Sequence, residues 1–259
     1  MAEIVTTDHA TQAGHWYQKD GTPAYTIIGK NGKERPTTLR DARKLGLVPS
    51  VTTVIGCASS PGLINWKIDQ AILSALTLGR LEEETEKEYL DRIKADAQEQ
   101  AKKAAERGTQ IHAWVQEGFE GKPVALAGTK YFTRAYHEVL EQTKVNDWIC
   151  EKPFATEKYG GKCDLHNEQY LLDIKTTDKP VADLKLWESH FMQLAAYRNG
   201  LKLIIPCGIL WINSVTAESR LVWAEEDDLD KGWKMFSALL DYFYAKTGLE
   251  VQDGKRSSN

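Results

Sequence analysis

The chain has 259 residues, with 42% hydrophobic and 27% charged residues, values that are ordinary for a globular protein with a substantial core. Its net charge of −4 argues against tight binding along an extended duplex. No apolar run reaches the roughly 18–20 residues that span a bilayer. The N-terminal residues lack a secretion or mitochondrial signal pattern, and the four cysteines are scattered as reduced thiols would be. These features predict a cytoplasmic protein without membrane contact.

The N-terminal residues are expected to form β-structure followed by a short helix. Turn signals at Asp20-Gly21 and Asn31-Gly32 have apolar and aromatic residues beside them, which is typical of hairpins within residues 15–39. A helix is predicted over residues 39–47, ended by Pro49.

Three helices are predicted next. The first opens at 60–62, where a proline suits the first turn, and continues to about residue 78. The second covers 82–118 and the third 129–144. Near the end of the second helix His112 lies at the edge of an apolar stripe formed by Ile111, Trp114 and Val115.

Strands and helices then alternate. Strands are expected at 147–156, 161–166, 170–176, 203–213 and 219–224, with helices at 183–200 and 225–246. This order predicts an α/β (α+β) fold with a central mixed sheet flanked by helices. We expect residues 61–250 to form this core with a helical insertion at 61–145, residues 1–60 to form an N-terminal extension, and residues 251–259 to be a disordered tail.

The two strands around the polar turn at 166–169 bring three charged residues together. One strand carries Asp164, and the other carries Asp173 and Lys175. Converging carboxylates repel each other, so this arrangement favours a hard divalent cation, Mg²⁺ or Mn²⁺. A lysine beside that cation can orient or deprotonate a water, or stabilise charge on a phosphate. From these residues alone, a hairpin whose charges face solvent is the alternative.

Motifs in the rest of the chain resemble those of the PD-(D/E)xK nuclease superfamily, in its RecB-like branch. Gly161-x-x-Asp164 followed by Asp173-Ile174-Lys175 resembles the core of that superfamily. The sequence R-G-T-Q-I-H at 107–112 resembles a helix motif whose histidine joins the metal site, and Q-L-A-A-Y at 193–197 resembles the Q-x-x-x-Y motif. Glu151 stands where the family has an acidic strand residue.

A second resemblance covers the N-terminal part. The sequence P-S-V-T-T-V-I at 49–55, followed by L-I-N-W at 63–66, resembles a segment of phage-encoded exonucleases and of the mitochondrial genome maintenance exonuclease. Together the resemblances imply a restriction-endonuclease-like core and a metal-dependent DNA exonuclease that acts on single strands or DNA ends. Recombination and replication proteins of a phage or its host would be candidate partners.

The resemblance also implies roles for individual residues. Asp164, Asp173 and the backbone carbonyl of Ile174 would hold one or two Mg²⁺ or Mn²⁺ ions, and His112 would complete the site or bind the second ion. Lys175 would orient the attacking water.

Other residues are assigned supporting roles by the same resemblance. Glu151 would act behind the ligands or on a second metal, or it would pair with its neighbour Lys152. The predicted contacts with DNA are made by Gln193, Tyr197, Arg107 and Thr109. For Tyr197, packing of the helix against the sheet is a serious alternative. A glycine inside a helix costs about 1 kcal/mol relative to alanine, so Gly108 predicts close approach of another backbone or a substrate.

Other functions remain open. An endonuclease of the same fold would nick a circular plasmid, whereas a catalytically silent DNA-binding module is disfavoured by the intact set of Asp164, Asp173 and Lys175. A nucleotide-processing metalloenzyme is disfavoured because no glycine-rich phosphate loop is present. Only Cys207 follows the motifs, so no iron–sulfur cluster is expected.

Overall fold

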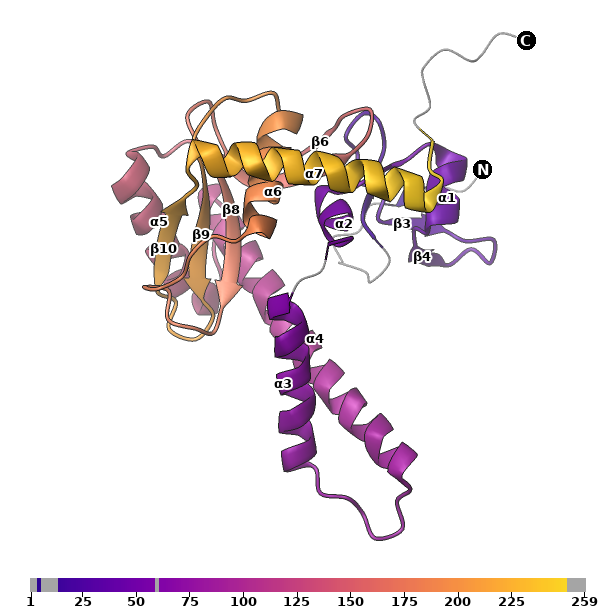
Figure 1. The fold of residues 1–259 in the computed structure, drawn as a ribbon. Helices are drawn as coiled ribbons and strands as arrows, with labels where there is room; N and C mark the ends of the chain where they lie inside the picture. Colours follow the sequence, from indigo (N-terminus) through magenta and orange to yellow (C-terminus); the bar gives the residue numbers. More distant parts are fainter. Residues whose placement is uncertain (1–3, 6–13, 59–60, 251–259) are drawn as a thin grey trace, which may run out of the picture.

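A five-stranded sheet forms the centre of the molecule (Figure 1). The computed structural model describes residues 4–5, 14–58 and 61–250, so the predicted disordered tail lies outside the described residues. Neighbouring strands pair in the order β10-β9-β8-β7-β6, with β8 and β9 parallel and the other pairs antiparallel. The strands are β6 (Ile149–Ala155), β7 (Gly160–His166), β8 (Leu171–Thr177), β9 (Cys207–Asn213) and β10 (Ser219–Trp223).

Helices cover both faces of this sheet, which confirms the predicted mixed sheet flanked by helices. Successive strand residues point to opposite faces. Leu171 of β8 therefore packs with α6 (Glu188–Gly200) and α7 (Glu226–Thr247). Leu172 packs on the other face, with α4 (Glu86–Phe119) and α5 (Leu126–Thr143). Each face has its own buried apolar cluster.

The N-terminal residues form small β-structures. The strands β3 (Thr26–Ile28) and β4 (Glu34–Pro36) form the hairpin predicted at Asn31-Gly32, and β1 (Ile4–Val5) pairs with β3. In contrast, β2 (Trp16–Tyr17) pairs with β5 (Val48–Pro49), so most of its pairing lies outside the hairpins predicted within 15–39.

Two short helices join this region to the main core. The helix α1 (Leu39–Leu45) ends earlier than predicted, because Gly46 adopts a left-handed conformation (φ 66°) and caps it before Pro49 is reached. The helix α2 (Val51–Ile55) begins after Ser50, whose side chain accepts a hydrogen bond from the Thr53 amide. Val51 and Val54 are buried in the cluster that also contains α6 and α7.

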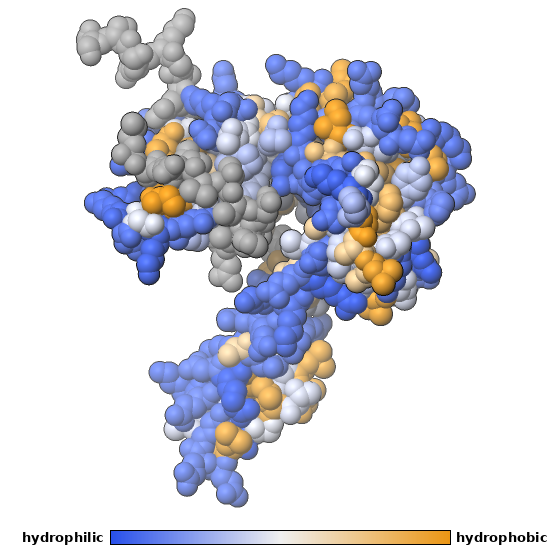
Figure 2. Space-filling model, turned by 180° about the vertical axis from the view of Figure 1, so that it is seen from behind, coloured by the Kyte–Doolittle hydropathy of each residue, from blue (hydrophilic) through white to orange (hydrophobic). Residues whose placement is uncertain are grey.

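A pair of helices projects from the sheet as an arm (Figure 1). It consists of α3 (Pro61–Thr77), close to the predicted bounds, and the first half of α4. The two helices contact each other through Ser74 Oγ, which donates to Asp96 Oδ2 at 2.7 Å. Figure 2 shows hydrophobic residues exposed on the arm, and α3 contributes Leu63, Ile64, Ile68, Ile72, Leu73 and Leu76.

Several other boundaries differ from their predictions. The helix α4 begins at Glu86 and not at residue 82, α5 begins at Leu126 and not at residue 129, and β9 begins at Cys207 and not at residue 203. The helix α6 begins at Glu188, five residues after the predicted start, because Trp187 has extended backbone angles (φ −124°, ψ 166°). Across the described ranges, no helix has both the length and the apolar character that crossing a membrane requires.

Candidate active site

The strands β7 and β8 separate at the position of the two aspartates. They pair at Leu165 with Leu172 and at His166 with Leu171, next to the polar turn. One step further, Asp164 and Asp173 are opposite in register, but the strands no longer pair there. Instead, Asp164 Oδ2 accepts a hydrogen bond from the Ile174 amide at 2.6 Å. The Asp164 carboxylate thus accepts the hydrogen bond that a main-chain carbonyl of β7 would accept in a regular sheet. Both acidic side chains lie where β7 and β8 separate, a place that we call the fork.

Along β7, the side chains change the face of the sheet to which they point near this fork. Cys163 packs toward α6 and α7, whereas Leu165 packs toward α4 and α5, although residues two apart in a regular strand share a face. On β6, Glu151 lies opposite Asp164 and has a left-handed φ of 52°. Such a conformation costs a non-glycine residue about 1–3 kcal/mol and is concentrated at functional sites.

The helix α6 contacts Asp173 through the side chain of Gln193. Gln193 Nε2 donates to Asp173 Oδ1 at 2.8 Å and contacts the Tyr197 hydroxyl at 3.0 Å. Both side chains are buried, so the structure places them beneath Asp173 and not on a surface that DNA reaches directly. Packing of Tyr197 against the sheet, the alternative to a DNA contact, is what the geometry favours. A Cβ atom on Gly161 would lie 2.8 Å from Tyr197 Cε1, which explains the glycine in the G-x-x-D motif.

The helix α4 brings His112 to the same fork. His112 Nδ1 lies 3.8 Å from Asp164 Oδ2. A Cβ atom on Gly108 would lie 2.9 Å from Thr176 Oγ1, so the glycine allows α4 to pack closely against the end of β8. Gly108 was predicted to be approached by another backbone or a substrate, but the group close to it is the Thr176 side chain.

Two other residues of the R-G-T motif lie away from the carboxylates. Thr109 is exposed, and its hydroxyl donates to the Ala105 carbonyl of its own helix at 3.1 Å. Arg107 is exposed and lines a cavity on another flank of α4.

Burial and mutual repulsion control the charge state of this site. Burial, and then the neighbouring Asp173 and Glu151, raise the pKa of the Asp164 carboxyl well above its usual value. Burial opposes charge on Lys175, but Asp173 and Asp164 more than compensate and raise the pKa of its ammonium group. Lys175 is therefore charged at neutral pH in the protein without a metal. This favours its roles in orienting water or stabilising a phosphate over a role as a base.

The two histidines near the fork are neutral at pH 7. Burial, and then the Lys175 charge, lower the pKa of His112 to about 4, which leaves its imidazole able to bind a cation. His190 on α6 has a pKa lowered to about 4 by the same two causes. His190 was not predicted from the sequence, but its i, i+3 and i+7 spacing to Gln193 and Tyr197 places all three on one helix face.

The position of His190 follows from its contacts. Its ring packs edge-on against Trp211 with centroids 5.2 Å apart, and Trp211 lies opposite Lys175 in the parallel β8–β9 pair. Its Nδ1 accepts a hydrogen bond from the Trp187 amide at 3.1 Å, so the proton of the neutral ring is on Nε2.

Glu151 pairs with a lysine other than Lys152, the partner that the sequence left open as an alternative. Its carboxylate forms an ion pair with Lys162 of β7 and not with Lys152. Glu151 is nevertheless near enough to Asp164 to raise the pKa of that carboxyl, so it belongs to the same acidic group.

The residues at the fork have the donor atoms that a divalent cation binds, although their present geometry does not form a coordination site. Among the described residues, no three His, Cys, Asp or Glu side chains gather closely enough to hold an ion as they stand. However, in the described part of the chain, buried Asp173 Oδ2 is paired with the Lys175 ammonium at 2.5 Å and has no other hydrogen-bond donor. Two repelling carboxylates and a neutral imidazole are suitable donors for Mg²⁺ or Mn²⁺ once Lys175 leaves that oxygen. The Ile174 carbonyl remains a predicted ligand.

Comparisons with known proteins by sequence give no relative. No family model and no curated protein matches the chain. Among solved structures, a candidate exonuclease from Eubacterium rectale is similar with a TM-score of 0.41 and 14% identity, over 56% of this chain and 69% of that protein. An alkaline exonuclease from Laribacter hongkongensis is similar with a TM-score of 0.28 and 10% identity, over 71% of this chain and 97% of that one. Similarities of this size carry no argument about activity.

Proposed function

We propose that the chain is a metal-dependent DNA exonuclease that hydrolyses phosphodiester bonds in single strands or at DNA ends. The observation that carries this proposal is the fork, where Asp164 and Asp173 converge with the Lys175 ammonium and the neutral His112 imidazole. The sequence motifs that resemble the RecB-like nucleases meet at this one place, which supports reading them as a site.

The proposed reaction forms a bond from a water oxygen to phosphorus and breaks the bond from phosphorus to a sugar oxygen. A bound Mg²⁺ or Mn²⁺ ion, held by Asp164, Asp173, the Ile174 carbonyl and His112, would activate the water and neutralise the phosphate. The Lys175 ammonium would orient that water or the phosphate oxygens by hydrogen bonds. Gln193 would keep Asp173 in place, because its amide occupies one carboxylate oxygen and leaves the other free.

The preference for ends rests on the N-terminal resemblance. The segment at 49–55 lies beside the start of β7, because Ser50 and Gly160 form a parallel bridge. This segment therefore contributes to the same unit as the fork, as expected if it takes part in the same function.

The test is digestion of end-labelled single-stranded and duplex oligonucleotides with Mg²⁺, with Mn²⁺ and with chelator, alongside a supercoiled plasmid. We expect metal-dependent loss of nucleotides from ends and an intact plasmid. Asp173→Asn should abolish this activity while the protein keeps its circular dichroism spectrum. Nicking of the plasmid would instead identify an endonuclease, and full activity of Asp173→Asn would refute the site.

A further inference from the structure

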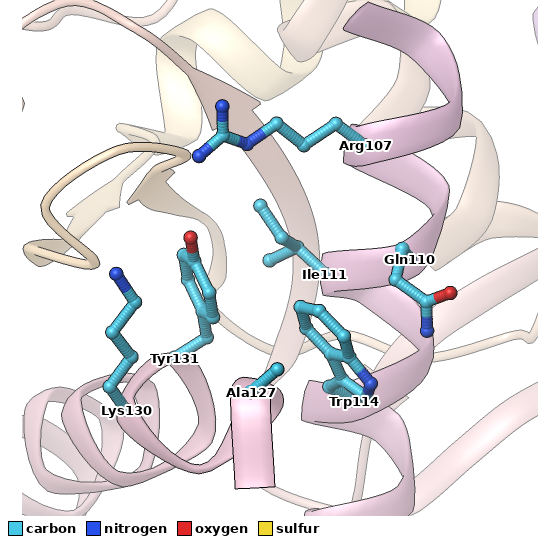
Figure 3. Close-up of a pocket in the computed structure, with 7 residues that line it drawn as sticks. All are labelled: Arg107, Gln110, Ile111, Trp114, Ala127, Lys130 and Tyr131. Carbon is cyan, nitrogen blue, oxygen red and sulfur yellow. The ribbon is translucent and has the colours of Figure 1, made fainter. Parts of the chain in front are cut away.

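A cavity of about 440 Å³ lies between α4 and α5 (Figure 3). It is lined by Arg107, Gln110, Ile111, Trp114, Ala127, Lys130 and Tyr131. At about 100° per residue, the lining residues of α4 form a stripe on a different flank of the helix from Gly108 and His112. Its volume lies within the range of roughly 300–1,000 Å³ of small-molecule sites. The cavity is thus separate from the fork but shares α4 with it.

Two cations border the opening of this cavity. Figure 3 shows Arg107 reaching over it from α4 and Lys130 rising from α5 on the other side. Among the described residues, the Arg107 side chain has no hydrogen bond or ion pair, and Lys130 is bound only to the Val215 carbonyl, at 3.1 Å, and over the Tyr131 ring. No acidic residue lines the cavity. An anionic group between these cations would reduce their mutual repulsion.

Fixed rings form the wall beneath the cations. The Trp114 and Tyr131 rings are stacked, with centroids 5.7 Å apart and planes 21° apart. Gly128 makes room for Trp114, since a Cβ atom there would lie 2.3 Å from the indole Cγ. The Tyr131 hydroxyl donates to the Ser214 carbonyl at 2.8 Å. Ile111 and Tyr131 are buried, so they hold the partly buried Trp114 ring as a rigid apolar wall beside the two cations.

A chain of contacts places the cavity next to the proposed active site. Arg107 precedes Gly108, which packs against Thr176, and Thr176 directly follows Lys175 on β8. Arg107 is thus one residue from the helix position that packs against β8, the strand that carries Lys175. Because a nucleotide combines an anionic phosphate with an aromatic base, it matches both the cations and the rings. An acidic peptide would match the cations alone.

We propose that this cavity binds one nucleotide of the single-stranded DNA on which the fork acts. The phosphate lies between Arg107 and Lys130, and the base or sugar contacts Trp114, which is only partly buried. This proposal rests on the proposed nuclease function and extends it to a second point of contact with the strand.

The test measures binding of a short labelled single-stranded oligonucleotide to the full-length Asp173→Asn protein in chelator, over a range of salt concentrations. Each phosphate contact contributes about 0.7 to the slope of log affinity against log salt for single strands. Lys130→Gln should therefore lower that slope by about 0.7. The matched control is Lys234→Gln, which removes the same charge from an exposed position of α7 on the other face of the sheet and should leave the slope unchanged.

A second pair of variants adds a charge instead of removing one. Ala127→Glu places a carboxylate at the cavity and should weaken binding several-fold. Thr129→Glu adds the same charge to an exposed position of the same helix turn outside the cavity, and it should have much less effect. Trp114→Leu should weaken binding by about 5-fold or more through lost stacking. If Trp114→Leu fails to fold, the Ala127 and Thr129 pair still decides the outcome.

The results separate failure of the cavity from failure of the nuclease. If wild type degrades DNA but Lys130→Gln and Ala127→Glu bind like their controls, the cavity proposal is wrong and the nuclease proposal stands. If wild type cleaves nothing but both variants differ from their controls, the cavity binds nucleic acid and the nuclease proposal is wrong. Displacement of the oligonucleotide by polyglutamate, with no effect of folded Trp114→Leu, would also overturn the nucleotide assignment.

Discussion

Replacing Gln193 by leucine tests whether α6 positions the metal-binding carboxylate. The substitution keeps the side chain's approximate size but removes the donor to Asp173 Oδ1 and the contact with the Tyr197 hydroxyl. Both Gln193 and Asp173 are buried, at 7% and 2% exposure, so water does not readily replace the lost donor. A hydrogen bond to a charged group contributes roughly 1.5–3 kcal/mol, and we expect the free energy of unfolding to fall by about 2 kcal/mol. For a protein of this size, that is a decrease of about 4–8 °C in melting temperature.

The decisive measurement is turnover per folded molecule as a function of metal concentration. A carboxylate without its donor is no longer held for the cation, so Gln193→Leu should need more metal for half-maximal activity and should have a lower kcat at saturation. Asn213→Ala is the control, because it also removes a buried amide but one that bonds to backbone at the end of β9. Equal loss of stability in both variants, with normal metal dependence in Gln193→Leu, would refute the positioning role.

Three further predictions follow from the site. Lys175→Ala should lose at least about 100-fold in turnover, while Mn²⁺ affinity measured by calorimetry rises because the competing ammonium is gone; weaker Mn²⁺ binding would contradict this role. Gly161→Ala should reduce stability by about 1–3 kcal/mol in urea unfolding, since the new Cβ would collide with Tyr197 and Phe154; Gly79→Ala is the control, because nothing lies within 4 Å of the added Cβ there and its φ, like that of Gly161, is not left-handed. His190 has a pKa of about 4 in the folded protein and an ordinary value of 6.5, so the unfolded chain binds more protons between these values and the contribution of His190 to stability is lost as pH falls from about 6.5 to about 4. Asp164 acts in the opposite direction because its pKa is raised; the difference in unfolding free energy between wild type and His190→Gln isolates the histidine, and a difference that does not vary with pH would contradict the assignment.

The sequence predicts those parts of the fold that depend on local pattern. The hairpin that carries Asp164 and Asp173 lies within one residue of its predicted strands, because its apolar runs and polar turn specify it locally. Helix α3 was located equally well from Pro61. In contrast, the end of α1 was misplaced because the left-handed cap at Gly46 acts before Pro49 does.

The parts of the site that could not be predicted depend on tertiary contacts. The fork requires β7 and β8 to separate at one position, and nothing in the alternation of the strands indicates where pairing stops. The Glu151 ion pair goes to Lys162 across the sheet, although Lys152 is adjacent in sequence. Gln193 is in a motif, yet only the packing of α6 on β8 shows that it contacts Asp173 and is buried.

The length of α4 has a mechanical consequence. The helix is continuous from Glu86 on the arm to Phe119, and it touches β8 closely at Gly108. At 1.5 Å per residue, the arm end of α4 lies about 33 Å from this contact, and His112 lies about 6 Å beyond it. If the helix tilts as a rigid rod about Gly108, a displacement of about 5 Å at the arm moves His112 by about 1 Å in the opposite direction. Misplacement of about 1 Å is enough to affect catalysis, so a force on the arm would change the distance between His112 and the carboxylates and thereby the activity.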